Sequence, residues 1–194
     1  MNLLIEENEI LIQQVLHDLE SFLPNIVLVG GWLPYIYAKY VWQGVMERPV
    51  TTSDIDIAIR PGIIGENISQ CLTRLHYHKK HLYFGKEVPY AFLILNEQNN
   101  MKIPLDLICA EKDLAEIEKV SGKDVIVSHF IGFEILYEDL LWTNVFGVRL
   151  AIPSPERYIF YKLKTFLTAV MSINAEKIST TFALYTKLTP ITIL

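Results

Sequence analysis

The spacing of apolar residues changes several times along this chain, and each spacing predicts a different element. Between residues 5 and 22 the apolar positions recur every three or four residues, which indicates a helix that Pro24 ends. The run 26–29 is short, continuous and mostly β-branched, as expected of a buried strand. Gly30 and Gly31 follow, and the next dozen residues return to helical spacing. The first part of the chain therefore predicts helix, strand, turn and helix.

A second strand is predicted where polar and apolar residues alternate in the order D-I-D-I-A-I, at residues 54–59. In a strand, side chains two residues apart point to the same face, about 6 to 7 Å from each other. Asp54 and Asp56 therefore project together, while Ile55, Ile57 and Ile59 project into a core. Two neighbouring carboxylates repel each other, and a divalent cation between them removes this cost. Oxygen ligands of this kind suit Mg²⁺ or Mn²⁺.

The later elements are predicted from the same patterns. A polar loop at 96–100 joins two strand-like runs into a β-hairpin, which would bring Asp106 back beside the Asp54 strand. Ser154 resembles a helix N-cap, with Pro155 and Glu156 in the first turn. In chain order, the elements predicted after the second strand are a helix at 68–75, strands at 88–95 and 102–109, a polar helix at 110–119, short strands within 125–152 of which 145–152 is the clearest, a helix from 154 to about 171, and a weak helix at 175–187.

Three motifs in order carry a resemblance to a known family. A strand ends in Gly30–Gly31, a helix follows, and Asp54 and Asp56 alternate with apolar residues. Asp106 then supplies a third carboxylate flanked by apolar residues. Together these motifs resemble the signature of the nucleotidyltransferase superfamily, which shares its fold with DNA polymerase β. The resemblance covers roughly residues 20–170.

Further features are similar to one subgroup, the AbiEii-type abortive-infection toxins and related bacterial proteins with this fold. The gap between Gly31 and Asp54 is long, and R-P-V-T-T-S at 48–53 precedes the paired carboxylates. Ser-Pro-Glu at 154–156 and Lys-Leu at 162–163 match motifs that often follow the core. Two features depart from the pattern, because Trp32 stands where relatives place a small or hydroxyl residue, and no Asp follows 176–181, where relatives carry a Lys-Asp pair.

The resemblance implies an α+β (α/β) fold, in which a nucleotidyltransferase-like mixed β-sheet is flanked by helices and followed by a small C-terminal helical part. We expect a core with its N-terminal helix over residues 1–152. Residues 153–194 would form the helical segment, which the missing Lys-Asp motif suggests is incomplete.

The resemblance also implies a chemistry. In this superfamily three carboxylates hold two divalent metals, Mg²⁺ or Mn²⁺, which bind the triphosphate of an NTP and activate an acceptor hydroxyl for in-line attack on the α-phosphorus. By this resemblance Asp54 and Asp56 are shared metal ligands, and Asp106 is a ligand and a candidate general base. Gly30 and Gly31 would let the backbone approach phosphate.

Positive charge for the triphosphate would come from Arg48 or Lys162. Each of these residues also has a purely structural interpretation, because Arg48 suits an ion pair and Lys162 suits a solvated helix face. In the same way, the aspartates suit caps or solvent-facing strand positions, and the glycines suit a tight turn. The aromatic residues at 32–42 are interpreted as core rather than as a base-stacking surface. His76, His78 and His81 match no zinc spacing, and a solvated basic turn is the favoured interpretation.

Composition narrows the function classes. Hydrophobic residues make up 51% and charged residues 20% of the 194 residues, so a full core is expected and global disorder is not. The net charge of −5 argues against non-specific binding of duplex nucleic acid, although it leaves room for a local basic groove. Cys71 and Cys109 stand in no metal or redox spacing and are expected to be reduced thiols. The acidic start predicts no signal peptide, no stretch suits a membrane helix, and the expected location is cytoplasmic.

Three functions remain as hypotheses. The first is a metal-dependent nucleotidyltransferase that moves an NMP from an NTP to an acceptor hydroxyl on RNA, protein or a small molecule, with release of pyrophosphate. The second is an inactive relative that binds nucleotide or a protein partner without turnover. The third is an antibiotic-modifying adenylyltransferase. A role as a toxin would add an antitoxin partner.

Overall fold

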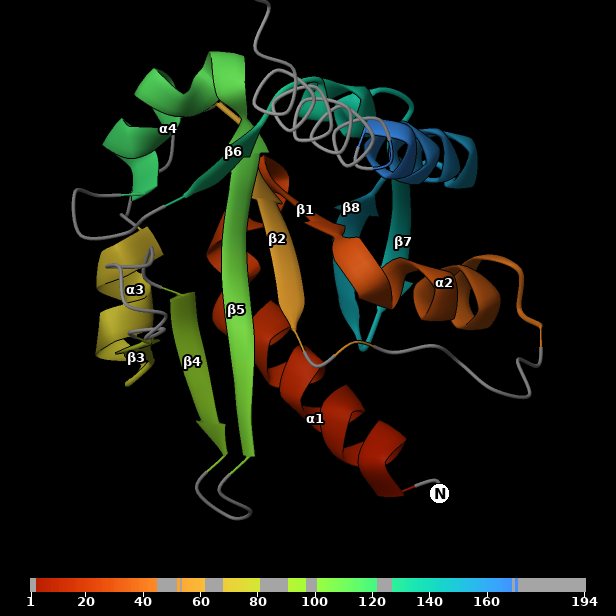
Figure 1. Cartoon of the computed structure of the whole chain (residues 1–194). Coiled ribbons are helices and arrows are strands. Elements are labelled where there is room, and N and C mark those ends of the chain that lie inside the picture. The colour runs from red at the N-terminus through yellow and green to blue at the C-terminus, as the bar shows by residue number, and fades with distance from the viewer. Residues whose placement is uncertain are drawn as a thin grey trace, which may run out of the picture.

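A mixed β-sheet runs through the middle of the molecule, with helices on both faces (Figure 1). The computed structural model describes residues 3–44, 52, 54–61, 68–80, 91–96, 101–121, 127–168 and 170. The predicted α+β class, a mixed sheet flanked by helices, is confirmed. The strands are β1 Ile26–Val29, β2 Ile55–Ile59, β3 His78–Lys80, β4 Ala91–Asn96, β5 Met101–Ala110, β6 Ser128–Phe130, β7 Leu141–Val145 and β8 Val148–Ile152.

The described strands are ordered β3-β4-β5-β2-β1-β8-β7, and β6 pairs with β5. The predicted hairpin is confirmed, because β4 and β5 pair antiparallel. The same long strand β5 then pairs parallel with β2. On the other side, β2 pairs antiparallel with β1, and β1 pairs parallel with β8. The centre of the sheet therefore places β1, β2 and β5 side by side.

Several helical segments connect these strands. They are α1 Leu3–Asp18, a 3₁₀ segment Glu20–Asn25, a 3₁₀ turn Gly30–Trp32, α2 Leu33–Ile36, a π-helical turn Tyr37–Val41, α3 Ile68–Arg74, a 3₁₀ turn Glu111–Asp113, α4 Leu114–Ser121, a 3₁₀ segment Phe133–Tyr137 and a helix over 155–168. Among the described residues, no helix combines the length and the apolar character that crossing a bilayer requires.

The alternation of side chains along the strands divides the core into two clusters. Ile26 and Leu28 of β1 join the larger cluster, which α1, α2, α3 and α4 cover. Val27 and Val29 join a smaller cluster with the 3₁₀ segment Phe133–Tyr137 and with the helix over 155–168. That smaller cluster fixes the helix over 155–168 against the same face of the sheet to which the even-numbered residues of β2 point.

Two predicted elements are wrong in detail. The helix predicted over 5–22 ends at Asp18, because Leu19 interrupts it and the chain continues as the 3₁₀ segment with Pro24 inside. The strand predicted over 145–152 is a hairpin, in which β7 and β8 meet at Phe146–Gly147. Both turn residues have positive φ, 51° and 86°, as in the tight turns that join antiparallel strands. The mostly apolar sequence at 145–152 did not predict this turn, and Gly147 was the residue in it that is typical of a turn.

The predicted helix after Ser154 is present over 155–168. The division at residue 152 stays a prediction, because residues 171–194, including the weak helix expected at 175–187, lie outside the described residues.

Candidate metal and nucleotide site

Three carboxylates from distant parts of the chain meet at one patch of the sheet. Asp54 immediately precedes β2, Asp56 lies within β2, and Asp106 lies within β5. The parallel pairing of these strands places Asp56 directly opposite Asp106. One oxygen atom from each of the three carboxylates lies within 4.8 Å of the others, and all three side chains are partly buried. The convergence expected from the sequence is therefore present, while the role of the carboxylates as ligands stays a prediction.

The patch concentrates negative charge at a cost. Burial, together with the charges of Asp54 and Asp106, raises the pKa of the Asp56 carboxyl to about 6, although Lys162 and the backbone N–H of Gly31 act in the opposite direction. Such a group of anions is stable at neutral pH only when positive charge offsets the repulsion. Closely placed carboxylate oxygens are the donors that Mg²⁺ and Mn²⁺ prefer, so the residues present fit a divalent cation.

Gly30 and Gly31 pack directly against this patch. Gly30 has φ +78°, and a Cβ atom there would lie 1.7 Å from Oδ2 of Asp56. Gly31 donates its backbone N–H to the Asp56 carboxylate, and a Cβ atom there would lie 2.0 Å from Cγ2 of Thr52. The packing of the Asp56 carboxylate therefore requires Gly30, whereas Gly31 is required by the close approach of the Thr52 side chain. These are additional roles beside the predicted contact with phosphate, which stays a prediction.

The helix over 155–168 brings two more side chains towards the carboxylates. The positive charge of Lys162 lowers the pKa of Asp56, so this lysine, the predicted phosphate ligand, lies near the carboxylate patch. Burial raises the pKa of Tyr158, and the charge of Asp56 adds to this increase. Nζ of Lys162 lies 5.7 Å from the centroid of the Tyr158 ring. Tyr158 was not among the site residues predicted from the sequence. Its signal was the distance of four residues from Lys162, which puts both side chains on one face of a helix.

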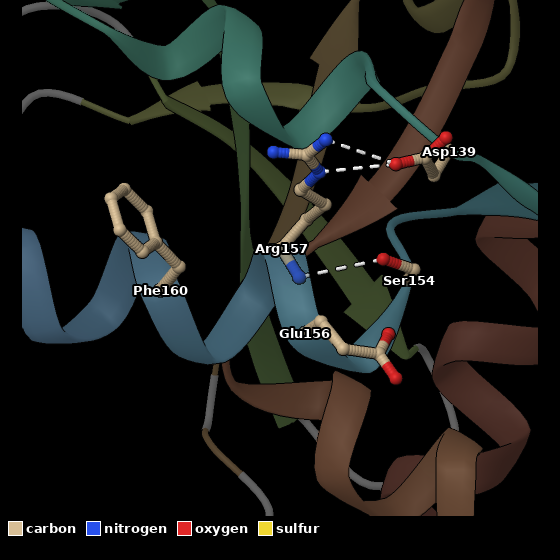
Figure 2. Close-up of a pocket in the computed structure, with 5 residues that line it drawn as sticks. All are labelled: Asp139, Ser154, Glu156, Arg157 and Phe160. Atoms are coloured by element: carbon tan, nitrogen blue, oxygen red, sulfur yellow. Dashed lines mark hydrogen bonds and ion pairs between the residues drawn. The ribbon is translucent and has the colours of Figure 1, made fainter.

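The start of this helix is anchored at several points. The backbone N–H of Arg157 donates to Oγ of Ser154 at 3.4 Å, which confirms the predicted N-cap. The Arg157 guanidinium bonds to Asp139 at 3.0 Å and pairs with Glu138 at 2.9 Å. Figure 2 shows the Arg157 contacts with Asp139 and Ser154 beside a cavity of about 490 Å³. These contacts hold the first turn, and with it the direction of Tyr158 towards the carboxylates.

The structure also shows where the aromatic residues and the cysteines considered in the sequence lie. Trp32 is fully buried in the larger core cluster, so its ring takes no space above the carboxylates. Tyr35 and Tyr37 are also buried, as expected for core residues, whereas Trp42 is 61% exposed. Cys71 and Cys109 are buried thiols that are not joined by a disulfide.

Some of these residues lie outside the described part of the chain. Arg48 and His81 belong to undescribed segments, and the side chain of His78 is not described. The residues at 176–181, which replace the expected Lys-Asp motif, are also undescribed.

Comparisons with known proteins add one similarity. No family model matches the chain, and no curated protein matches it. Among solved structures, the chain is similar to an antigenic nucleotidyltransferase-like protein from Paracoccidioides brasiliensis, with a TM-score of 0.47 and 14% sequence identity. The similarity covers 79% of this chain and 63% of that chain, so this chain spans less than two thirds of that structure. What the chain does is therefore inferred from its own site.

Proposed function

We propose that this protein is a metal-dependent nucleotidyltransferase that moves an NMP from an NTP to an acceptor hydroxyl and releases pyrophosphate. The observation that carries the proposal is the convergence of Asp54, Asp56 and Asp106, whose oxygen atoms lie within 4.8 Å of one another. A hydrogen bond from Gly31 holds one of these carboxylates, and a lysine stands beside them. Phosphoryl transfer depends on such positioned charges, because the transferred group carries dispersed negative charge.

The site residues would divide the work of binding metal, binding triphosphate and accepting a proton. Asp54, Asp56 and Asp106 would hold Mg²⁺ or Mn²⁺, which when bound supplies positive charge to the entering and leaving oxygens. Lys162 would bind the triphosphate, and Gly30–Gly31 would leave room for it. Asp106 would accept the proton of the acceptor hydroxyl. The acceptor oxygen then forms its bond to the α-phosphorus while the bond to the pyrophosphate oxygen breaks.

The finer parts of the proposal concern the acceptor and the partners. The acceptor is RNA, a protein side chain or a small molecule, and the net charge of −5 does not distinguish these. We place the chain near the AbiEii-type toxins on its sequence motifs, and an antitoxin partner belongs to the same proposal.

Transfer of label from an α-³²P-labelled NTP in the presence of Mn²⁺ tests this function. The acceptors are total RNA, cell protein and an aminoglycoside, assayed separately. We expect metal-dependent labelling by the wild-type protein and its loss in Asp54→Ala. Glu116→Gln, which removes an exposed carboxylate on α4, is the matched control and is expected to retain labelling. NTP binding without labelling of any acceptor would favour the inactive relative.

Lys162→Gln is expected to raise the KM for the NTP by about tenfold or more, because one charge-assisted contact with the triphosphate is lost. The matched control is Lys164→Gln on the same helix. Nζ of Lys164 lies next to Gly132, where an added Cβ atom would lie 2.0 Å away, so this lysine serves another contact. Initial rates over a range of NTP concentrations measure the change. Equal KM values for the two variants would remove Lys162 from the site.

A further inference from the structure

An apolar cavity lies between α2 with the π-helical turn and the helix over 155–168, and Tyr158 is one of its lining residues. Its volume is about 410 Å³, within the usual range for small-molecule sites. Its walls come from the stretch from α2 through the π-helical turn and from the first turn of the helix over 155–168, and it opens to solvent. None of its lining residues is charged; they are Pro34, Tyr37, Ala38, Trp42, Gly44, Pro155, Tyr158 and Ile159.

Tyr158 connects this cavity to the carboxylates. It lines the cavity, its ring lies 5.7 Å from Nζ of Lys162, and its pKa responds to the charge of Asp56. Tyr37 packs against it, with ring centroids 6.0 Å apart. The hydroxyl of Tyr37 donates to the carbonyl of Pro153 at 2.8 Å, which fixes that wall. A ligand that reaches the carboxylates with one end would therefore have this cavity next to it.

The backbone presents an aromatic ring at the rim of the cavity. The π-helical turn Tyr37–Val41 places the N–H of Trp42 on the carbonyl of Tyr37 at 2.8 Å. The two rings then lie with centroids 5.6 Å apart. Trp42 nevertheless stays 61% exposed, which leaves much of a large apolar surface in water. Single π-helical turns are rare and occur often at functional sites.

We propose that this cavity binds the base of the NTP, with Trp42 as the stacking surface, while the triphosphate lies over the carboxylates. This inference rests on the proposed function. A base is uncharged, which suits walls without charged residues, and it is planar, which suits stacking on the Trp42 ring. An RNA acceptor would bring phosphates, and the uncharged lining provides no partner for them. Stacking of a base on an aromatic side chain contributes about 1 to 3 kcal/mol.

Calorimetric titration with Mn²⁺-ATP and Mn²⁺-tripolyphosphate tests this inference, because the second ligand lacks both the ribose and the base. The wild-type protein is expected to bind ATP at least about tenfold more tightly than tripolyphosphate. Trp42→Ala and Ala38→Leu, which remove the stacking surface and fill the cavity, should raise the Kd for ATP by about tenfold and leave the Kd for tripolyphosphate unchanged. Trp142→Ala on β7, where the ring is also exposed, is the matched control and should change neither.

Each result decides the matter. If the wild-type protein binds both ligands equally, or if both cavity variants bind ATP as the wild type does, the base lies elsewhere. The carboxylate site and the proposed function then stand. If neither ligand binds in Mn²⁺, the proposed function fails and the base site fails with it.

Discussion

Asp56→Asn is expected to lower nucleotidyl transfer by about a thousandfold or more and also to stabilise the metal-free protein at pH 7.5. The loss of activity follows because the Asp56 carboxylate lies close to both other carboxylates and accepts a hydrogen bond from the Gly31 N–H. The gain in stability follows because the wild-type protein keeps three acidic groups close together. Asparagine retains an oxygen that accepts from Gly31 and removes one of the repelling charges.

The direction of the pH dependence follows from the raised pKa. Burial, with the neighbouring aspartates, raises the pKa of Asp56 from 3.8 to about 6 in the folded protein. The folded state therefore holds this proton more tightly than the unfolded state. Below about pH 4 both states are protonated and nothing is lost, and stability falls as the pH rises to about 6. Above that pH the ionised group destabilises the metal-free protein by about 3 kcal/mol relative to acid pH.

Thermal unfolding between pH 4 and 8, with EDTA or with Mn²⁺, measures both effects. The wild-type Tm in EDTA is expected to fall across this range through the Asp56 contribution, and Mn²⁺ should restore it at pH 7.5. Asp56→Asn should flatten this part of the profile and lose most of the response to Mn²⁺. Asp113→Asn, which changes a carboxylate outside the patch, should keep both the pH dependence of the Tm and the response to Mn²⁺. Identical profiles for the wild type and Asp56→Asn would show that Asp56 does not carry the repulsion.

Local patterns in the sequence were sufficient to predict the central strands and the carboxylates. The continuous apolar run of β1 and the alternation in β2 are properties of neighbouring residues, and both strands are where they were expected. The polar loop between two strand-like runs predicted the pairing of β4 with β5, and the parallel pairing of β5 with β2 then places Asp106 opposite Asp56.

Features that depend on contacts between distant elements were not predicted. The charge of Asp56 affects the pKa of Tyr158 because the contacts of Arg157 and Ser154, together with the smaller core cluster, fix the direction of the helix over 155–168. The turn at Gly147 was not predicted, because β7 and β8 join through Phe146–Gly147 without a polar loop. The π-helical turn that places Trp42 beside Tyr37 follows a helical apolar pattern, which does not distinguish it from a regular α-helix.

Gly30→Ala is expected to disrupt the carboxylate patch and to lower stability by about 2 to 5 kcal/mol. Two causes combine at this position. The φ of +78° is unfavourable for any residue with a Cβ atom and costs about 1 to 2 kcal/mol. The new methyl group would also lie 1.7 Å from Oδ2 of Asp56, so the carboxylate or the strand must move. Overpacking of this kind costs about 1 to 3 kcal/mol.

Gly147→Ala separates these two causes. Gly147 has a similar φ of +86°, but a Cβ atom there would meet nothing within 4 Å. Chemical denaturation should therefore show a loss of about 1 to 2 kcal/mol for Gly147→Ala and a larger loss for Gly30→Ala. Only Gly30→Ala should also lose stabilisation by Mn²⁺ and NMP transfer, because only there does the methyl group displace Asp56. Equal losses of stability with a full response to Mn²⁺ in both variants would mean that Gly30 is needed only for its positive φ. The position of the Asp56 carboxylate would then not depend on Gly30.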